Sequence, residues 1–340
     1  MPSPPLIVVG GSAGGLDAAT RLVGRLDAAL PAAVAVVLHQ ASGADDYVTR
    51  RLVGATSLPV GVASDGGCLE AGHVVVAPAD RHLRFEDGHM RVAFGPRVNR
   101  VRPAIDVAMR AAAASHGART IGVVLSGLLD DGSAGLAAVR RAGGVVLVQD
   151  PDDAEHGDMP RNALASVTPD FVGSAEALAA RLHELVGGLP AMPGAIPDDV
   201  VTEARIDARA TGDIAMTDTI GTQVPFSCPD CGGPVWEIDA PGPRRYRCHV
   251  GHAFSQASML RSQEETVEES LWVALRTLEE RARLLDRLAD TSRSSLADGY
   301  RQQADETRTH AHRIRDLLAT RHEEPPPVPA PALTAPTARA

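Results

Sequence analysis

Aromatic side chains and lysine are the scarcest features of this 340-residue sequence. Phe, Trp and Tyr make up 3% of the residues, and all 33 basic residues are Arg. So few aromatics leave little surface for stacking nucleic-acid bases, and a formal net charge of −10 disfavours nucleic acid or an anionic membrane as a partner. No run of 18 apolar residues is present, so we expect no membrane insertion.

Cysteine is also scarce, and its four positions argue against a disulfide framework. Cys68 stands alone, whereas Cys228, Cys231 and Cys248 lie close together late in the chain. Grouped thiols of this kind are typical of a metal site in a reducing compartment. Residues 1–11 lack a basic start and predict a first strand rather than a signal peptide. We therefore expect a cytoplasmic protein, and we interpret Cys68 as an inert, partly buried thiol.

The first half of the chain alternates short apolar runs with Ala-, Leu- and Arg-rich stretches. Each run is rich in β-branched residues, as strands buried on both faces are, and the stretches between have helical periodicity. This alternation predicts an α/β fold with a doubly wound, mostly parallel sheet over residues 1–188. A hairpin is expected at 82–95, with Asp87-Gly88 as its turn. The predicted strands are 6–10, 33–39, 73–78, 120–127 and 144–150, and the predicted helices are 16–30, 102–117 and 134–144.

The second half is divided by changes in composition. Residues 189–222 are rich in Gly and Pro and are interpreted as a linker. Residues 223–256 contain the grouped cysteines and predict a small zinc-ribbon-like module. Residues 257–322 carry apolar residues three and four apart around a polar break, which predicts a helical hairpin or a short coiled-coil pair. Residues 323–340 are Pro- and Ala-rich and are expected to be disordered.

A glycine-rich turn follows the first predicted strand. Gly10 to Gly15 fits the pattern G-x-S-x-G between a strand and a helix, which exposes a nucleophilic serine, here Ser12. The helix N-terminus that follows favours an anionic intermediate at the same place. The alternative is a phosphate loop in a nucleotide-binding enzyme. It is disfavoured because Ser12 replaces the second Gly of G-x-G-x-x-G, and because the second strand ends in His39 rather than an acid.

Two further candidate groups end other predicted strands. His39 ends the second strand, and the stretch 126–132 after another strand contains the adjacent acids Asp130 and Asp131. Neighbouring parallel strands open on the same crevice, so His39 can meet Ser12 and act as its general base. Either acid could orient His39, or could instead cap the following helix. Spacing alone does not choose between Asp130 and Asp131.

Five segments of residues 5–186 carry a combined signature: GGSAGG, the histidine after the second strand, NRVRPAIDVAM (99–109), LSGLLDDGSAGL (125–136) and VVLVQDPDDAEHGDMPRNAL (145–164). Together they resemble the CheB-type protein-glutamate methylesterase domain of bacterial chemotaxis. The resemblance implies a serine carboxylesterase that removes methyl esters from receptor glutamates, deamidates certain receptor glutamines and needs no cofactor for catalysis. It assigns Ser12 as nucleophile, His39 as base and Asp131, directly before Gly132, as the orienting acid.

Two features depart from that family. Leu128-Leu129 stand where Met-Gly is usual, which changes the side chains beside the ester, although Leu128 still offers a backbone N–H, with Ala13, for an oxyanion hole. The best-known members also carry an N-terminal phospho-receiver domain, whereas this chain starts on the first strand, so we expect another form of control. A non-catalytic signalling scaffold with a methylesterase-like fold is the alternative hypothesis.

The resemblance implies a methylated chemoreceptor-like protein as partner. Arg97, Arg100 and Arg102 are candidates for contacting its acidic surface, and a solvated charged face explains them equally well. We expect the cysteine module and the helical hairpin to bind a signalling partner or to mediate self-association.

The grouped cysteines predict a structural Zn²⁺ site. Cys228 and Cys231 form a C-x₂-C knuckle, Cys248 is the third thiolate, and a histidine completes a tetrahedral set. His252 is preferred as the fourth ligand because Gly precedes it and lets the chain fold back, whereas His249 beside Cys248 would strain the chelate. Unligated cysteines are disfavoured, because this region has too few apolar residues for a core of its own.

Overall fold

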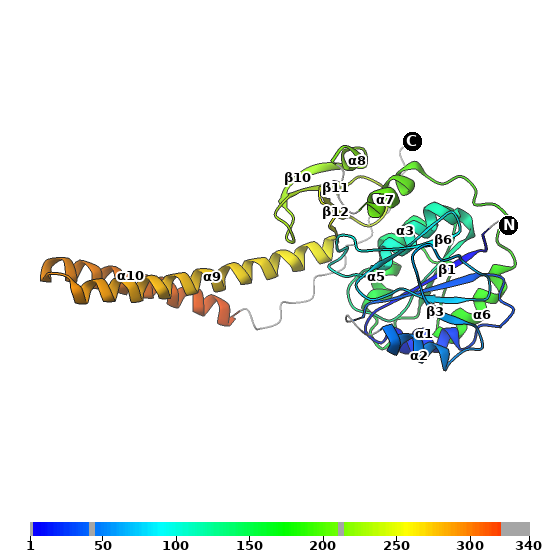
Figure 1. Ribbon diagram of the computed structural model, residues 1–340, viewed down its shortest axis with the longest axis horizontal. Coiled ribbons are helices and arrows are strands. Elements are labelled where there is room, and N and C mark those ends of the chain that lie inside the picture. Colours follow the sequence, from blue (N-terminus) through cyan, green and yellow to red (C-terminus); the bar gives the residue numbers. More distant parts are fainter. Residues whose placement is uncertain (1–2, 41–44, 210–213, 321–340) are drawn as a thin grey trace, which may run out of the picture. The chain divides into compact units, whose positions relative to one another are not determined.

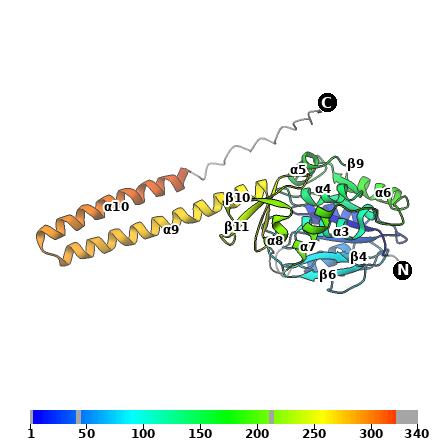
Figure 2. The same ribbon diagram turned by 90° about the horizontal axis from the view of Figure 1, so that it is seen from above.

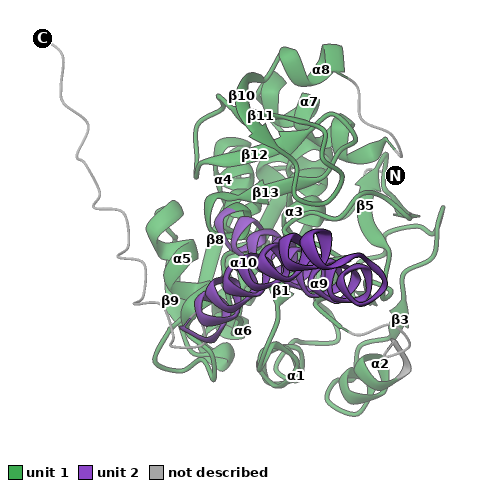
Figure 3. Ribbon diagram, turned by 90° about the vertical axis from the view of Figure 1, so that its left-hand side faces the viewer, with its two compact units in different colours: residues 1–259 green, residues 260–340 purple. Residues whose placement is uncertain are grey.

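The computed structural model of the chain describes residues 3–40, 45–209 and 214–320 (Figure 1). The chain forms two compact units, Met1–Met259 and Leu260–Ala340 (Figure 3). The expected disordered tail, 323–340, lies outside the described residues. Among the described residues, no helix is long and apolar enough to cross a membrane.

The first unit is built on a seven-stranded sheet in which every neighbouring pair is parallel. The strand order is β3-β4-β2-β1-β7-β8-β9. The five predicted strands are confirmed, and the fully buried runs lie at the centre, as the apolar pattern requires. The strands are β1 (Leu6–Gly11), β2 (Ala33–Leu38), β3 (Val60–Val62), β4 (Val74–Val76), β7 (Thr120–Val124), β8 (Val145–Gln149) and β9 (Phe171–Gly173).

Helices cover both faces of this sheet and give it two separate cores (Figure 1). One face packs against α1 (Gly15–Val23), α2 (Asp45–Val53) and α6 (Ala175–Val186). The other packs against α3 (Ile105–His116), α4 (Ser133–Arg141) and α5 (Asp158–Ser166), with a short 3₁₀ turn at Gly117–Arg119. The predicted doubly wound α/β fold is therefore confirmed.

The predicted hairpin is also present, as β5 (His82–Glu86) and β6 (His89–Ala93). Asp87 and Gly88 form its turn with φ of 49° and 76°, and positive φ at both central residues matches the twist of the strands. Cys68 pairs with His89 through an isolated bridge beside this hairpin, and its side chain is exposed. The expectation that Cys68 is partly buried was wrong: its neighbour Leu69 is the side chain that enters the core, and that of Cys68 is left exposed.

The segment interpreted as a linker contains two helices, α7 (Asp198–Ala208) and α8 (Ile214–Asp218). Val200 joins the core formed with α3, and Ile206 is buried against β-strands of the cysteine module. Figure 2 shows α7 lying over α3. This segment is therefore not an extended linker. It packs against the first unit's core and the cysteine module, because α7 buries apolar residues there.

The cysteine module is a four-stranded antiparallel sheet in the order β10-β11-β12-β13. Its strands are β10 (Gly221–Ser227), β11 (Pro234–Ile238), β12 (Arg245–Cys248) and β13 (Ala253–Ser255). The small core beneath it contains Val235, Tyr246 and Phe254 together with two of the cysteines. A module with so few apolar residues gains little from burial alone.

The second unit is a helical hairpin formed by α9 (Gln256–Thr291), which begins in the first unit, and α10 (Ser294–Thr320). Leu275, Ala311 and Leu318 form its buried seam. Ion pairs cross from one helix to the other at Arg308 with Asp286 and at Arg315 with Glu279. The predicted helical hairpin and its polar break are both present, although Val267 and Leu288 of the predicted apolar stripe are exposed.

Candidate active site

Ser12 lies on a tight turn between β1 and α1. Its amide donates to the Ser126 carbonyl at 2.9 Å, which ties the turn to the end of the neighbouring strand β7. Gly14 has φ of 69°, and a Cβ there would lie 2.7 Å from Ser126 Oγ. The turn thus needs glycine at this place for its left-handed backbone and for its close neighbour. Ser12 is held at the carboxyl end of the sheet.

His39 follows β2, the strand beside β1. Its amide donates to the Gly11 carbonyl at 3.2 Å, which continues the β1–β2 pairing by one residue. Its ring lies between two partners: Nδ1 is 3.1 Å from Ser12 Oγ, and Nε2 is 2.7 Å from Asp131 Oδ2. The structure therefore brings together the serine, the histidine and one of the two candidate acids.

Asp131 is almost fully buried, and the groups around it stabilise its charge. Besides His39, Oδ2 accepts the amide of Ile105, the first residue of α3, at 2.7 Å. Asn99 Nδ2 donates to Oδ1 at 3.0 Å. Burial raises the pKa of Asp131, but these hydrogen bonds and the adjacent imidazole outweigh it and hold that pKa below its ordinary value. The carboxylate is kept ionised beside His39.

Asp130 points elsewhere, so geometry separates the two acids that spacing could not. Its Oδ1 accepts the hydroxyl of Ser255 from the cysteine module at 2.7 Å, and burial raises its pKa. Neither acid caps α4, because Gly132 occupies the N-cap position with φ of 98°. Asp106 does this instead, since its Oδ1 accepts the amides of Gly132 and Gly135.

Sequence reasoning assigned no individual role to Asp106 and Asn99, which lie in the stretch 99–109. Asp106 is buried, and burial together with the charge of Asp131 raises its pKa to about 7. Asn99 Nδ2 donates to Asp106 Oδ2 at 2.9 Å and thus bridges the two carboxyl groups. The signal available in the sequence was an Asn that opens the motif 99–109 and an Asp in the first turn of the helix expected there.

Ala13 and Leu128 carry the two backbone amides that the sequence offered for an oxyanion hole. In the part of the chain that the structure describes, neither Ala13 nor Leu128 donates its amide to another residue. The turn that carries Leu128 lies against the serine, because a Cβ on Gly127 would be 3.0 Å from Ser12 Cβ. Leu128 and Leu129, which replace the usual Met-Gly, expose 47% and 37% of their surface. They form an apolar rim on the turn beside Ser12.

The three candidate arginines differ in their surroundings. The Arg102 side chain is 8% exposed, pairs with Asp80 at 2.7 Å and lies over the Phe94 ring. It is therefore committed within the fold, and neither contact with a partner nor a solvated charged face describes it. Arg97 and Arg100 are exposed.

The cysteine module brings Cys228, Cys231, Cys248 and His252 together, with one donor atom from each within 4.8 Å of the others. Cys231 Sγ and Cys248 Sγ are 3.8 Å apart, and His252 Nδ1 is 3.5 Å from Cys248 Sγ. Two thiolates bound at about 2.3 Å to a tetrahedral ion would lie about 3.8 Å apart, so the donor set fits Zn²⁺. His249 is not a member of this group.

The comparisons with known proteins all concern the first unit. The family described as CheB methylesterase matches residues 7–182. The chain is 41% identical over 184 residues to protein-glutamate methylesterase/protein-glutamine glutaminase 3 of Anaeromyxobacter dehalogenans, covering 54% of each chain. It is 33% identical over 178 residues to protein-glutamate methylesterase/protein-glutamine glutaminase 2 of Rhodospirillum rubrum, covering 51% of this chain and 49% of the relative.

A solved structure agrees with these relatives. The catalytic domain of the Thermotoga maritima CheB methylesterase matches with a TM-score of 0.52 and 30% identity, over 54% of this chain and 99% of that one. The chain spans about half the length of the curated relatives it matches. The family match over residues 7–182 agrees with the parallel sheet and with the residues at its strand ends, and the chain belongs to the CheB methylesterase family.

Proposed function

We propose that the chain is a cytoplasmic serine carboxylesterase that hydrolyses glutamyl methyl esters on chemoreceptor-like proteins and deamidates some of their glutamines. The observation that carries this proposal is the hydrogen-bonded series from Ser12 through His39 to Asp131. A nucleophile, a base within reach of it and an acid that orients the base are the parts that acyl transfer needs. The names of the relatives support the substrate.

The first half of the reaction acylates the serine. Ser12 Oγ attacks the ester carbonyl carbon, and its proton passes to His39 Nδ1. The proton already on Nε2 points at Asp131, whose negative charge stabilises the imidazolium that forms. The amides of Ala13 and Leu128 bind the oxyanion, and each good donor contributes about 3–4 kcal/mol.

The second half releases the products. The imidazolium of His39 donates its proton to the leaving methoxy oxygen, and methanol departs from the acyl-enzyme. Water then enters, and His39 removes its proton as the water oxygen attacks the acyl carbonyl. His39 passes that proton to Ser12 Oγ as the acyl–oxygen bond breaks, which restores the serine hydroxyl and leaves a glutamate product. With a glutamine substrate the same steps release ammonia in place of methanol.

The metal belongs to the fold in this proposal and takes no part in the chemistry. Cys228, Cys231, Cys248 and His252 would hold a structural Zn²⁺, which would supply the folding energy that the small core of the module lacks. Exposed Arg97 and Arg100, and the apolar rim at Leu128, are the surfaces offered to an acidic receptor surface.

Methanol release from a methylated receptor cytoplasmic fragment tests the proposal. Wild type should release methanol, Ser12→Ala should release it at the background rate, and Ser57→Ala, which changes an exposed serine away from the site, should match wild type. Wild type and Ser57→Ala should also react with a fluorophosphonate probe, and Ser12→Ala should not.

The scaffold alternative makes the opposite prediction. If folded wild-type protein neither releases methanol nor reacts with the probe, the esterase proposal is wrong and the fold serves binding alone. If Ser12→Ala keeps wild-type turnover, the nucleophile has been misassigned.

A further inference from the structure

The cysteine module is attached to the catalytic fold beside the acid of the triad. Val98 pairs with Ala253 of β13 in an isolated parallel bridge. The Asn99 amide donates to the Ala253 carbonyl at 2.8 Å, and the Ala253 amide donates to the Arg97 carbonyl at 3.3 Å. Strand β13 thus extends along the loop that carries Asn99.

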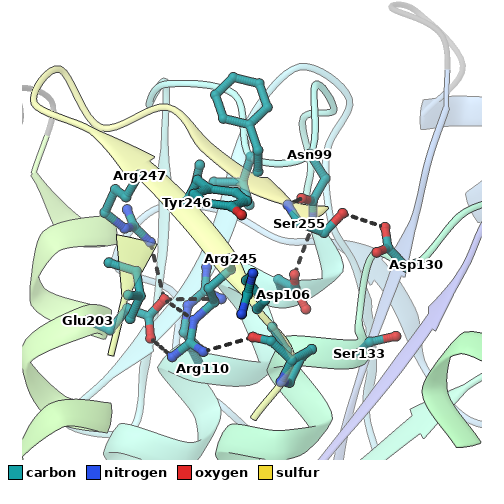
Figure 4. A pocket seen from close by; sticks show the side chains of 17 residues that line it. Asn99, Asp106, Arg110, Asp130, Ser133, Glu203, Arg245, Tyr246, Arg247 and Ser255 are labelled. Atoms are coloured by element: carbon teal, nitrogen blue, oxygen red, sulfur yellow. Dashed lines mark hydrogen bonds and ion pairs between the residues drawn. The ribbon is translucent and has the colours of Figure 1, made fainter. Parts of the chain in front are cut away.

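A buried set of ion pairs fixes the same module on its other side. Asp207 of α7 accepts from Arg110 of α3 and from Arg247 of β12, each at 2.7 Å. Glu203 of α7 accepts from Arg245 at 2.7 Å. Figure 4 shows Arg110, Glu203, Arg245 and Arg247 on one side of the contact and Asn99, Ser255 and Asp130 on the other. The module is therefore held at two places, and one of them is the loop beside the triad.

The Asn99 side chain uses all of its hydrogen-bonding capacity. Its Oδ1 accepts the Ser255 amide of β13 at 2.8 Å and the hydroxyl of Ser258, in the first turn of α9, at 3.1 Å. Its Nδ2 donates to Asp131 at 3.0 Å and to Asp106 at 2.9 Å on the catalytic side. Rotating the amide by half a turn would place Oδ1 against two carboxyl groups, so its orientation is fixed.

The backbone at this place also favours asparagine. Asn99 has φ of 51°, a left-handed conformation that Asn adopts more readily than most residues. A shorter or β-branched side chain would lose either the backbone fit or the bridge. The Asn99 side chain thus connects the module to Asp131, because its oxygen bonds Ser255 and its nitrogen bonds Asp131.

Resting on the proposed function, we propose that Asn99 is a positioning residue for Asp131 and that Ser255, the last residue of the cysteine module's β13, together with Ser258 in the first turn of α9, holds Asn99 in place. The folded module would thereby set the geometry of the triad. Asp131 must lie within a few tenths of an ångström of its place for His39 to keep its tautomer, and a displacement of about 1 Å can cost about 100-fold in rate.

Four substitutions in the full chain, purified after loading with Zn²⁺, separate the steps. Asn99→Ala removes both sides of the bridge. Asn99→Asp keeps the acceptor for Ser255 and Ser258 but removes the donor to Asp131. Ser258→Ala removes the contact from α9, and Ser258→Thr keeps that hydroxyl. Ser227→Ala, an exposed serine on β10 of the same module, is the control.

Two readouts follow each variant: the kinetic constants for methanol release, and the downfield proton resonance of His39 Nε2–H in protein labelled with ¹⁵N-histidine. We expect Asn99→Ala and Asn99→Asp to lower kcat about 10- to 100-fold with KM little changed, and to shift or broaden that resonance. Ser258→Ala should move both readouts in the same direction by less, and Ser258→Thr and Ser227→Ala should match wild type. Removing the metal with a chelator should also shift the resonance.

The proposal is wrong if both Asn99 variants keep the wild-type resonance and kcat. Its module part is wrong if Ser258→Ala and metal removal leave the His39 resonance unchanged. Should Asn99→Ala fail to fold, Asn99→Asp and Ser258→Ala still decide the question. The resonance reports on Asp131 even in a protein that hydrolyses no ester, so failure of the esterase proposal is read separately from failure of this one.

Discussion

The two ring nitrogens of His39 have different partners, one neutral and one negatively charged. Nδ1 is 3.1 Å from a neutral hydroxyl, and Nε2 is 2.7 Å from a buried carboxylate. Because the pKa of Asp131 is held below its ordinary value, this carboxylate stays charged and fixes the proton on Nε2. Nδ1 is then the unprotonated nitrogen that faces Ser12, as a general base requires.

The two adjacent acids give a direct test of this assignment. Asp131→Asn should lower kcat/KM for methyl-ester hydrolysis about 10⁴-fold, because an amide in place of the carboxylate no longer holds the proton on Nε2. Circular dichroism should show that the variant is folded.

Asp130→Asn is the matched control, one position away. Its amide oxygen can still accept the Ser255 hydroxyl, so the decrease should stay below about tenfold. Equal losses in the two variants would mean that the acid of the triad is wrongly assigned.

Glycines shape the turn that presents Ser12. Between β1 and α1 the chain reverses within three residues, and Gly14 combines φ of 69° with a neighbour 2.7 Å from any added Cβ. Left-handed backbone costs a non-glycine residue about 1–2 kcal/mol, and the contact with Ser126 Oγ adds to that cost. An added Cβ at Gly14 would therefore strain the turn through both the backbone and this close contact.

Gly14→Ala should lower both the free energy of unfolding and the rate of Ser12 labelling by a fluorophosphonate. Gly66→Ala is its control, because Gly66 has φ of 77° with nothing within 4 Å of an added Cβ. The control should lose about 1 kcal/mol of stability and keep the labelling rate. Equal labelling rates for the two variants would show that the turn tolerates a side chain at Gly14.

Elements differ in how clearly the sequence announces them. The central strands are apolar throughout because both faces are buried, so their runs were found. The edge strands β3 and β9 have three residues each and are partly exposed, so no such run marks them. Helix α1 ends at Val23, before the end of the predicted helix, and the amides of Arg25 and Leu26 then bond the carbonyls three residues back, as in a tightened last turn.

At the scale of the whole molecule, a buried ion-pair cluster joins three parts of the first unit: α3, α7 and the cysteine module. The side chains of Arg110, Arg247 and Asp207 are each 1–3% exposed. Removing one partner from such a group leaves an uncompensated buried charge, which costs about 3–5 kcal/mol. The segment expected to be a linker thus carries the carboxylates that attach the module.

Asp207→Ala should therefore lower the free energy of unfolding by about 3–5 kcal/mol. Urea denaturation followed by tryptophan fluorescence measures this, since Trp236 is buried in the module and Trp272 is exposed on α9. Asp17→Ala breaks an exposed pair with Arg51 and should lose far less. A loss in Asp207→Ala no larger than in Asp17→Ala would mean that the cluster does not hold the module.

The sequence by itself determined the parts of this protein whose signals are local. Buried strands need apolar runs, the turn at Ser12 needs glycines, and paired thiols need a fixed spacing, so each could be read within a few residues. The tertiary structure decided what depends on contacts between distant residues. It chose Asp131 over Asp130, committed Arg102 to Asp80 and placed Ser255 against Asn99, 156 residues earlier. A hydrogen bond forms only where the folded chain brings donor and acceptor together, and a local sequence pattern does not determine which distant residues come together.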